Sequence, residues 1–92
     1  MTKEEFLNLD AEFIWGWGDE FFLETDVGNF IWSDPDYRGD NTIRPTSQSY
    51  GQWIDPHNNG SFGRAKGVHN VRAYCGEDII LTDFPTQEIK DG

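Results

Sequence analysis

The sequence predicts an α+β fold in which a small antiparallel sheet of three or four strands carries short helices on one face. Residues 12–33 alternate their side chains with a period of two, which is typical of a three-stranded meander. A short apolar run within 78–82 predicts a fourth strand, and apolar residues at helical spacing elsewhere predict the helices. At 92 residues the chain has the length of one domain, 1–92.

The first helix is expected over about residues 3–10. Thr2 and Glu5 have the spacing of a capping box, in which each side chain bonds the other residue's backbone N–H. Phe6, Leu7 and Leu9 follow as the apolar side. Because so short a helix is unstable alone, we expect it to dock on the sheet.

The meander comprises strands at 12–17, 20–25 and 29–33. Gly18 and Asp19 suit a two-residue turn between the first two strands. Residues 26–28 suit a second turn, in which Gly28 takes a left-handed conformation. The middle strand places Phe21, Leu23 and Thr25 on an apolar face, and Glu20, Phe22 and Glu24 on an acidic one.

The aromatic side chains of the meander have two interpretations. They occur on both faces, and one short helix cannot cover them all, so some of Phe13, Trp15, Trp17, Phe30 and Trp32 would be exposed. Exposed aromatic patches usually mark a partner surface. In the alternative interpretation, the remaining loops cover these rings.

An acidic loop follows the meander at 34–41. Aligned as a calcium-binding loop from Asp34, it has Arg38 at one ligand position and Pro45 in place of the bidentate Glu, so we expect no metal. The carboxylates would instead pair with Arg38 and Arg44, or form an acidic ridge that faces a partner.

Two further helices are predicted in the second half of the chain. Residues 46–54 suit a short helix capped by Thr46, with Tyr50, Trp53 and Ile54 on its apolar side. Loop residues follow at 55–61. Val68, Val71 and Cys75 recur at helical spacing before Gly76, which predicts a helix from 65 or 68 to 75. The strand at 78–82 would join an edge of the meander, and residues 84–92 would form a frayed tail.

Charge is distributed unevenly along the chain. The net charge is −10, made up of −9 over residues 1–60, +3 over 61–76 and −4 over 77–92. A field of this sign repels nucleic acid and membrane phosphates and attracts basic protein surfaces. The alternative is that the charge serves only solubility.

The basic segment also has two interpretations. Residues 63–67 would precede a helix N-terminus, where Arg64, Lys66, His69 and Arg72 could bind an anion. Alternatively, these cations only neutralise neighbouring carboxylates of the same chain.

Several classes of protein are not favoured. A single Cys permits no intrachain disulfide, and the N-terminal residues lack the pattern of a signal peptide, so we expect a cytoplasmic protein of a bacterial host cell. We expect no enzyme and no cofactor. On a helix, Cys75 and His69 would lie about 240° apart, and Glu20 and Glu24 have no evident means of raising one pKa.

In size and charge the chain resembles small phage-encoded inhibitors of bacterial defence nucleases, such as anti-CRISPR and anti-restriction proteins. The resemblance is one of composition alone. The acidic, aromatic-bearing surface of the meander and the 34–40 loop predicts an inhibitor that binds a basic bacterial protein and occludes its nucleic-acid-binding groove, without contacting nucleic acid or membrane itself. The predicted partner-binding residues are Trp15, Trp17, Glu20, Glu24, Asp26, Trp32, Asp34, Asp36 and Asp40. The alternatives are an immunity or antitoxin protein that blocks a basic toxin, and a binder of nucleic acid or a phosphorylated ligand through the 63–72 segment. The small size is compatible with a homodimer.

Overall fold

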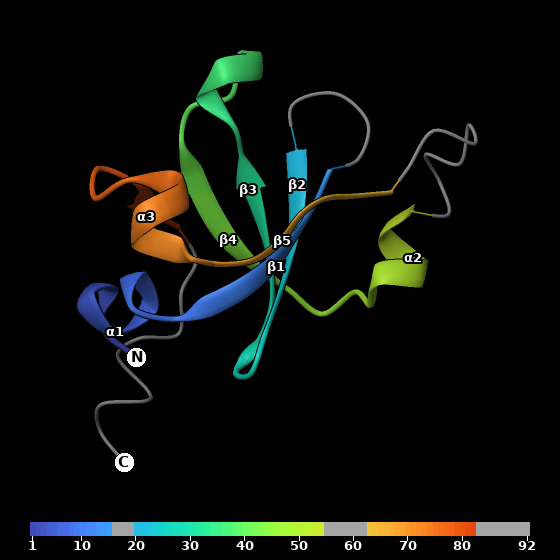
Figure 1. Cartoon of the computed structure of the whole chain (residues 1–92), viewed down its shortest axis with the longest axis horizontal. Coiled ribbons are helices and arrows are strands. Elements are labelled where there is room, and N and C mark those ends of the chain that lie inside the picture. The colour runs from blue at the N-terminus through green and yellow to red at the C-terminus, as the bar shows by residue number, and fades with distance from the viewer. Residues whose placement is uncertain (16–19, 55–62, 83–92) are drawn as a thin grey trace.

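In the part of the chain that the structure describes, six strands form one mixed sheet, with three short α-helices and one 3₁₀ turn around it (Figure 1). The structure is a computed structural model that describes residues 1–15, 20–54 and 63–82. The elements follow in the order α1 (Lys3–Leu7), β1 (Asp10–Trp15), β2 (Glu20–Thr25), β3 (Gly28–Ser33), η1 (Pro35–Tyr37), β4 (Thr42–Thr46), α2 (Tyr50–Ile54), β5 (Gly63–Asn70), α3 (Val71–Cys75) and β6 (Ile80–Leu81). The expected turn at 18–19, the loop at 55–61 and the frayed tail at 84–92 lie outside the described residues.

The strand order is β5-β1-β2-β3-β4-β6, and every neighbouring pair is antiparallel except β4 and β6, which are parallel. The α+β class is therefore confirmed. The predicted antiparallel sheet of three or four strands is too small, because β4 and β5 were not expected as strands. The last strand also joins β4 rather than the meander.

The meander forms at the expected place, but its first hairpin has a different register. A two-residue turn at 18–19 would place Trp15 opposite Phe22, whereas Trp15 lies opposite Phe21. In the observed register Phe13 lies opposite Leu23, so apolar residues pair across the strands. A shift by one residue would put Phe13 beside Glu24, and this cost to the core selects the register.

Strand β5 replaces most of the predicted third helix. Residues 63–70 pair with β1 along its outer edge, from Asp10 opposite Asn70 to Trp15 opposite Gly63. The pairing has a register shift between Glu12 and Ile14, and it outweighs a weak helical pattern that Gly67 interrupts. The helix begins only at Val71, where the Asn70 side chain accepts a hydrogen bond from the Ala73 N–H as an N-cap.

Strand β4 contains a proline, Pro45. β6 pairs with β4 only at Thr42 and Ile43, so Pro45 lies where β4 is an edge strand. A proline is tolerated there because no further strand needs its missing N–H.

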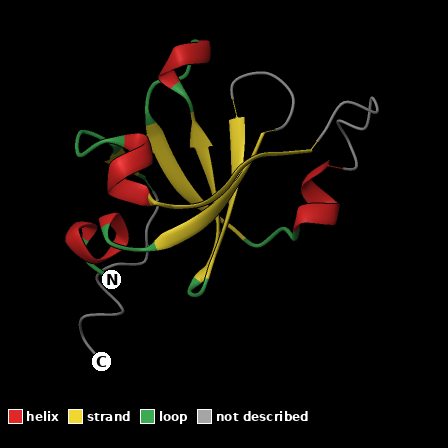
Figure 2. Ribbon diagram, in the orientation of Figure 1, coloured by secondary structure: helices red, strands yellow, loops and turns green. Residues whose placement is uncertain are grey.

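The helices lie on both sides of the sheet, which corrects the expectation that they share one face (Figure 2). The larger core cluster lies under α1 and α3. It consists of Phe6, Leu7, Ala11, Phe13, Phe21, Leu23, Phe30, Trp32, Ile43, Val71 and Ile79. The smaller cluster consists of Ile14, Phe22 and Ile31 of the sheet and Trp53 of α2. We call the side of the sheet that carries the larger cluster the closed face, and the side that carries the smaller cluster the open face.

Side-chain caps define the N-termini of α1 and α2, which lie on opposite faces of the sheet. The predicted capping box of α1 is confirmed, since the Glu5 N–H donates to Thr2 Oγ1 at 3.1 Å and the Thr2 N–H donates to Glu5 Oε1 at 2.7 Å. Ser49, rather than Thr46, caps α2. Its hydroxyl accepts from the Gln52 N–H at 3.2 Å and its N–H donates to Gln52 Oε1 at 2.9 Å, which is a second capping box.

Candidate functional site

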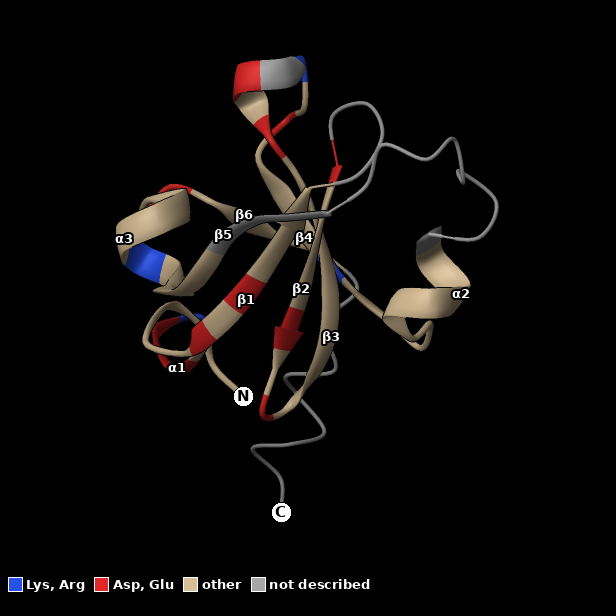
Figure 3. Cartoon of the chain, turned by 45° about the vertical axis from the view of Figure 1, so that its right-hand side comes forward, with Lys and Arg blue, Asp and Glu red and all other residues tan. Residues whose placement is uncertain are grey.

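Four acidic residues line a hollow at one end of the open face. In Figure 3, red segments mark acidic residues on β1, on β2 and in the turn between β2 and β3. Asp10 and Glu12 lie on β1, Glu24 lies on β2, and Asp26 lies in the turn between β2 and β3. Glu12 and Glu24 are directly opposite each other in the antiparallel register. Side chains two residues apart on a strand point to the same side, so this register brings the acidic positions of both strands together.

The four carboxylates surround a hollow of about 450 Å³, which Thr25 and Val68 complete. Val68 belongs to β5 and lies opposite Glu12 on the other side of β1. The hollow therefore spans three strands. The described residues that line it include four acids and no base.

Among the described residues, the buried apolar positions of the open face lie in the middle of the strands. Ile14, Phe22 and Ile31 form a patch that Trp53 of α2 covers, with the rings of Phe22 and Trp53 stacked at 5.3 Å. Toward the β2–β3 turn the same face carries Glu12 and Glu24. A five-residue helix is long enough to cover the patch but not the acidic end.

The other predicted acidic residues are not part of this hollow. Glu20, at the opposite end of β2, accepts a hydrogen bond from Arg44 at 3.4 Å. Asp36, within η1, and Asp40, before β4, are exposed, and Asp40 accepts a hydrogen bond from the Thr42 hydroxyl. Glu20, Asp36 and Asp40 therefore lie outside the surface that Asp10, Glu12, Glu24 and Asp26 form.

Asp34 is buried, with 6% of its surface exposed, and so cannot belong to an acidic ridge. Its carboxylate accepts a hydrogen bond from the Asp36 N–H at 2.9 Å and caps η1. Its carbonyl oxygen accepts from the Gly39 N–H at 2.8 Å. The residue shapes the turn after β3, which explains an Asp before Pro35 without a partner-binding role.

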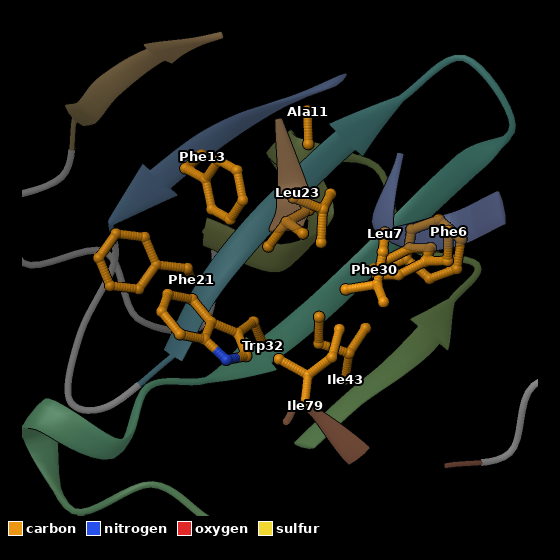
Figure 4. Close-up of a cluster of buried hydrophobic side chains, with 11 residues drawn as sticks. Phe6, Leu7, Ala11, Phe13, Phe21, Leu23, Phe30, Trp32, Ile43 and Ile79 are labelled. Carbon is orange, nitrogen blue, oxygen red and sulfur yellow. The ribbon is translucent and has the colours of Figure 1, made fainter. Parts of the chain in front are cut away.

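The predicted aromatic anchors are largely interior. Trp32 is 5% exposed, and its Nε1 donates to Asn41 Oδ1 at 2.9 Å. Figure 4 shows Trp32 facing Phe21 and Phe13, whose ring centroids lie 5.4 and 6.1 Å from it. Phe13 and Phe30 are also buried and Trp15 is half-buried, so α1, α3 and the neighbouring strands cover these rings. Trp17 lies outside the described residues.

The basic segment does not form the predicted anion cradle. Arg64 and Lys66 lie on β5, so residues 63–67 do not precede a helix N-terminus. Arg72 of α3 forms ion pairs with Glu4 of α1 and with Glu77, the latter at 3.1 Å. For Arg72 the structure therefore favours internal neutralisation of charge.

His69 lies on β5 and not on a helix beside Arg72. Its ring stacks on Tyr74 with centroids 5.1 Å apart and meets the edge of Phe13 at 6.3 Å. The residue thus packs toward the closed face. A phosphate at this position would have to displace aromatic contacts.

The prediction missed Asp10 and Glu12 as members of the acidic surface. Asp10, Glu12 and Ile14 follow one another at a spacing of two, so their side chains lie on one face of the sheet. The register places Phe22 and Glu24 on the same face. Val68 was missed because it was assigned to a helix. Only the pairing of β5 with β1 brings Val68 beside Glu12.

Cys75 is the one thiol of the sequence. Burial, with a smaller effect of Asp34, raises the pKa of the Cys75 thiol well above its usual range, so the reactive thiolate is suppressed. Within residues 1–15, 20–54 and 63–82, no group of three or more His, Cys, Asp or Glu could hold a metal ion. In the same ranges, no helix has the length and apolar character needed to span a membrane.

Comparison with known proteins gives no family or structural neighbour from which a role could be transferred. No protein-family model matches the chain, no curated protein gives a significant match, and neither does any solved structure.

Proposed function

We propose that this protein binds the basic surface of a protein partner through the acidic hollow of its open face, and thereby keeps nucleic acid from that surface. The observation that carries the proposal is the position of Asp10, Glu12, Glu24 and Asp26 around one hollow. Three separate elements contribute to it, so the concentration of charge depends on the fold.

Carboxylates in such an arrangement can take the place of phosphates. A basic groove that binds nucleic acid presents Lys and Arg side chains, which form charge-assisted hydrogen bonds with carboxylates as well as with phosphates. The net charge of −10 adds long-range attraction that accelerates association at low salt.

The same charges disfavour a direct role in nucleic-acid binding. The acidic hollow repels phosphates, and the ion pairs of Arg72 with Glu4 and Glu77 reduce the positive potential of the basic segment. Protein binding is therefore the better use of this surface.

We further propose that the partner is a bacterial defence nuclease complex and that the protein acts as a phage-type inhibitor of the anti-CRISPR or anti-restriction kind. Size and charge support this choice. An immunity protein that blocks a basic toxin would use the same surface, and the identity of the partner separates the two functions.

The test is affinity capture from bacterial lysate at low and high salt, with and without nuclease treatment, followed by a nucleic-acid-binding assay on each captured protein. We expect a basic protein to be retained at low salt, and its binding of DNA or RNA to fall when this chain is added. The double variant Asp10→Lys, Asp26→Lys should lose that effect.

A matched control is the double variant Asp36→Lys, Asp40→Lys. It changes the net charge by the same amount but alters residues outside the hollow. Equal loss in both variants would show that only total charge matters. Recovery of RNA or DNA in place of a basic protein, or full activity of the Asp10→Lys, Asp26→Lys variant, would contradict the proposal.

A further inference from the structure

We infer that a second, apolar hollow beside the acidic one anchors an aliphatic side chain of the same basic partner. This inference rests on the proposed function and specifies the chemistry of the partner. The hollow measures about 360 Å³ and is lined by Met1, Glu5, Leu9 and Val27. Three of these four residues are apolar.

The two hollows adjoin each other along the chain at two points. Leu9 lines the apolar hollow and Asp10 the acidic one, and likewise Val27 lines the apolar hollow and Asp26 the acidic one. The two hollows therefore lie on opposite sides of the β2–β3 turn, at one end of the sheet. A partner segment that crosses this turn would contact both hollows.

The exposed aliphatic residues support a docking role. Among the described residues, Val27, Val68 and Ile80 are the large hydrophobic residues that are exposed, at 52%, 62% and 54%. Val27 lines the apolar hollow and Val68 lines the acidic one. Aliphatic surface bordered by charge is the usual composition of a protein interface, in which apolar contacts supply affinity and the charged rim supplies orientation.

Charge complementarity identifies the occupant. Glu5 lies in the wall of the apolar hollow, and Asp10 and Asp26 follow directly at its border. A segment that places an aliphatic side chain here would have its flanking residues beside these carboxylates. The occupant we propose is therefore a protein segment in which one Leu, Ile or Met is flanked by Lys or Arg.

The test is an NMR titration of the full chain, with backbone amide and methyl signals observed at low salt. The probes are two short Lys- and Arg-rich peptides that differ only in a central residue, Leu in one and Ser in the other. Both should shift the signals of Asp10 and Asp26. The Leu peptide should also shift the methyl signals of Leu9 and Val27 and bind on the order of tenfold more tightly, because it buries an aliphatic side chain.

The variant Val27→Ser should remove this tenfold preference and leave binding of the Ser peptide unchanged. The matched control is Ile80→Ser, which changes an equally exposed aliphatic residue on β6 and should preserve the preference. Because both side chains are about half exposed, neither change should unfold the protein.

The outcomes distinguish the inference from the proposed function. If both peptides bind equally and shift only residues of the acidic hollow, the apolar anchor is wrong and the proposed function stands. If neither peptide shifts any signal, both are wrong. Equally tight binding of an acidic peptide with a central Leu would overturn the charge argument.

Two other occupants would also overturn the inference. Nuclear Overhauser contacts in the free protein between the Val27 methyl groups and residues 83–92 would show that the chain fills its own hollow. Shifts of the same methyl signals with protein concentration alone would assign the hollow to a second copy.

Discussion

The two faces of the sheet differ in where their apolar positions end. On the closed face, apolar side chains extend along the strands and form a cluster of eleven buried residues under α1 and α3. On the open face, four buried residues occupy the middle, and carboxylates follow directly beside them. The comparison indicates a division of roles, in which the closed face supplies most of the stability and the open face is free to present charge.

This division follows from the energies involved. Carboxylates that lie close together on a strand pair reduce stability by a few tenths of a kcal/mol up to about 1 kcal/mol. Burial of a single Phe contributes about 1.5–3 kcal/mol. A few buried rings on the closed face thus offset the repulsion that a concentrated acidic surface brings.

The largest test of this comparison substitutes one Phe on each face. Phe13 and Phe22 are both fully buried, but Phe13 contacts rings of the sheet and α3, whereas Phe22 stacks on the short helix α2. We expect Phe13→Ala to lower the free energy of unfolding by about 5 kcal/mol and Phe22→Ala by about 3 kcal/mol, because α2 can move into the space left. Urea unfolding followed by tryptophan fluorescence measures both. Equal costs would mean that the open face is as rigidly packed as the closed one.

A smaller test concerns Gly39, in the turn between β3 and β4. The same turn contains Asn41, whose side chain accepts a hydrogen bond from the indole of Trp32 on the closed face. A Cβ at Gly39 would lie 2.4 Å from the Ser33 carbonyl carbon and 2.6 Å from the Asp34 oxygen, both backbone atoms. We expect Gly39→Ala to lower the free energy of unfolding by about 3 kcal/mol. Gly67→Ala is the control, since nothing lies within 4 Å of its Cβ, and it should raise stability slightly. A neutral Gly39→Ala would show that the turn can rearrange.

The next test uses the thiol that packs against the closed face. Burial raises the pKa of Cys75 above its unfolded value, so the folded state holds its proton at pH values where the unfolded state releases it. The stability contributed by the protonated thiol is present below about pH 8.5 and declines as pH rises further. We expect a loss of about 1 kcal/mol between about pH 8.5 and pH 9.5. The variant Cys75→Ala should lack this part of the pH dependence, and an identical slope in both proteins would contradict the burial of the thiol.

The sequence predicts those features of each face that depend on residues close together in the chain. The capping box of α1 and the alternation in β2 involve residues close in the chain, and both are confirmed. The same alternation predicts that Glu24 shares a face with Phe22. It does not reveal whether a ring such as Trp32 is covered, because the cover comes from α3, far along the chain.

The third predicted helix is confirmed only over residues 71–75, because residues 63–70 pair with β1 instead. Val68, Val71 and Cys75 fit helical spacing, but residues 68–70 and 63–64 pair with β1, with a register shift between Glu12 and Ile14. The acidic hollow depends on that same pairing, which places Val68 opposite Glu12. Its charged residues were therefore predictable in part, and its shape was not.

The smallest predicted changes in the free energy of unfolding have opposite signs on the two faces. On the open face, the double variant Asp10→Asn, Asp26→Asn removes charge from a surface lined by four acids, so we expect the free energy of unfolding to rise by up to about 0.5 kcal/mol. On the side of α1 and α3, Glu4→Gln removes a partner of Arg72 and should lower it by up to about 0.5 kcal/mol. Urea titrations at low and high salt measure both changes, which salt should reduce. If Asp10→Asn, Asp26→Asn destabilised the protein instead, these carboxylates would serve the fold, and their availability to a basic partner would lose its support.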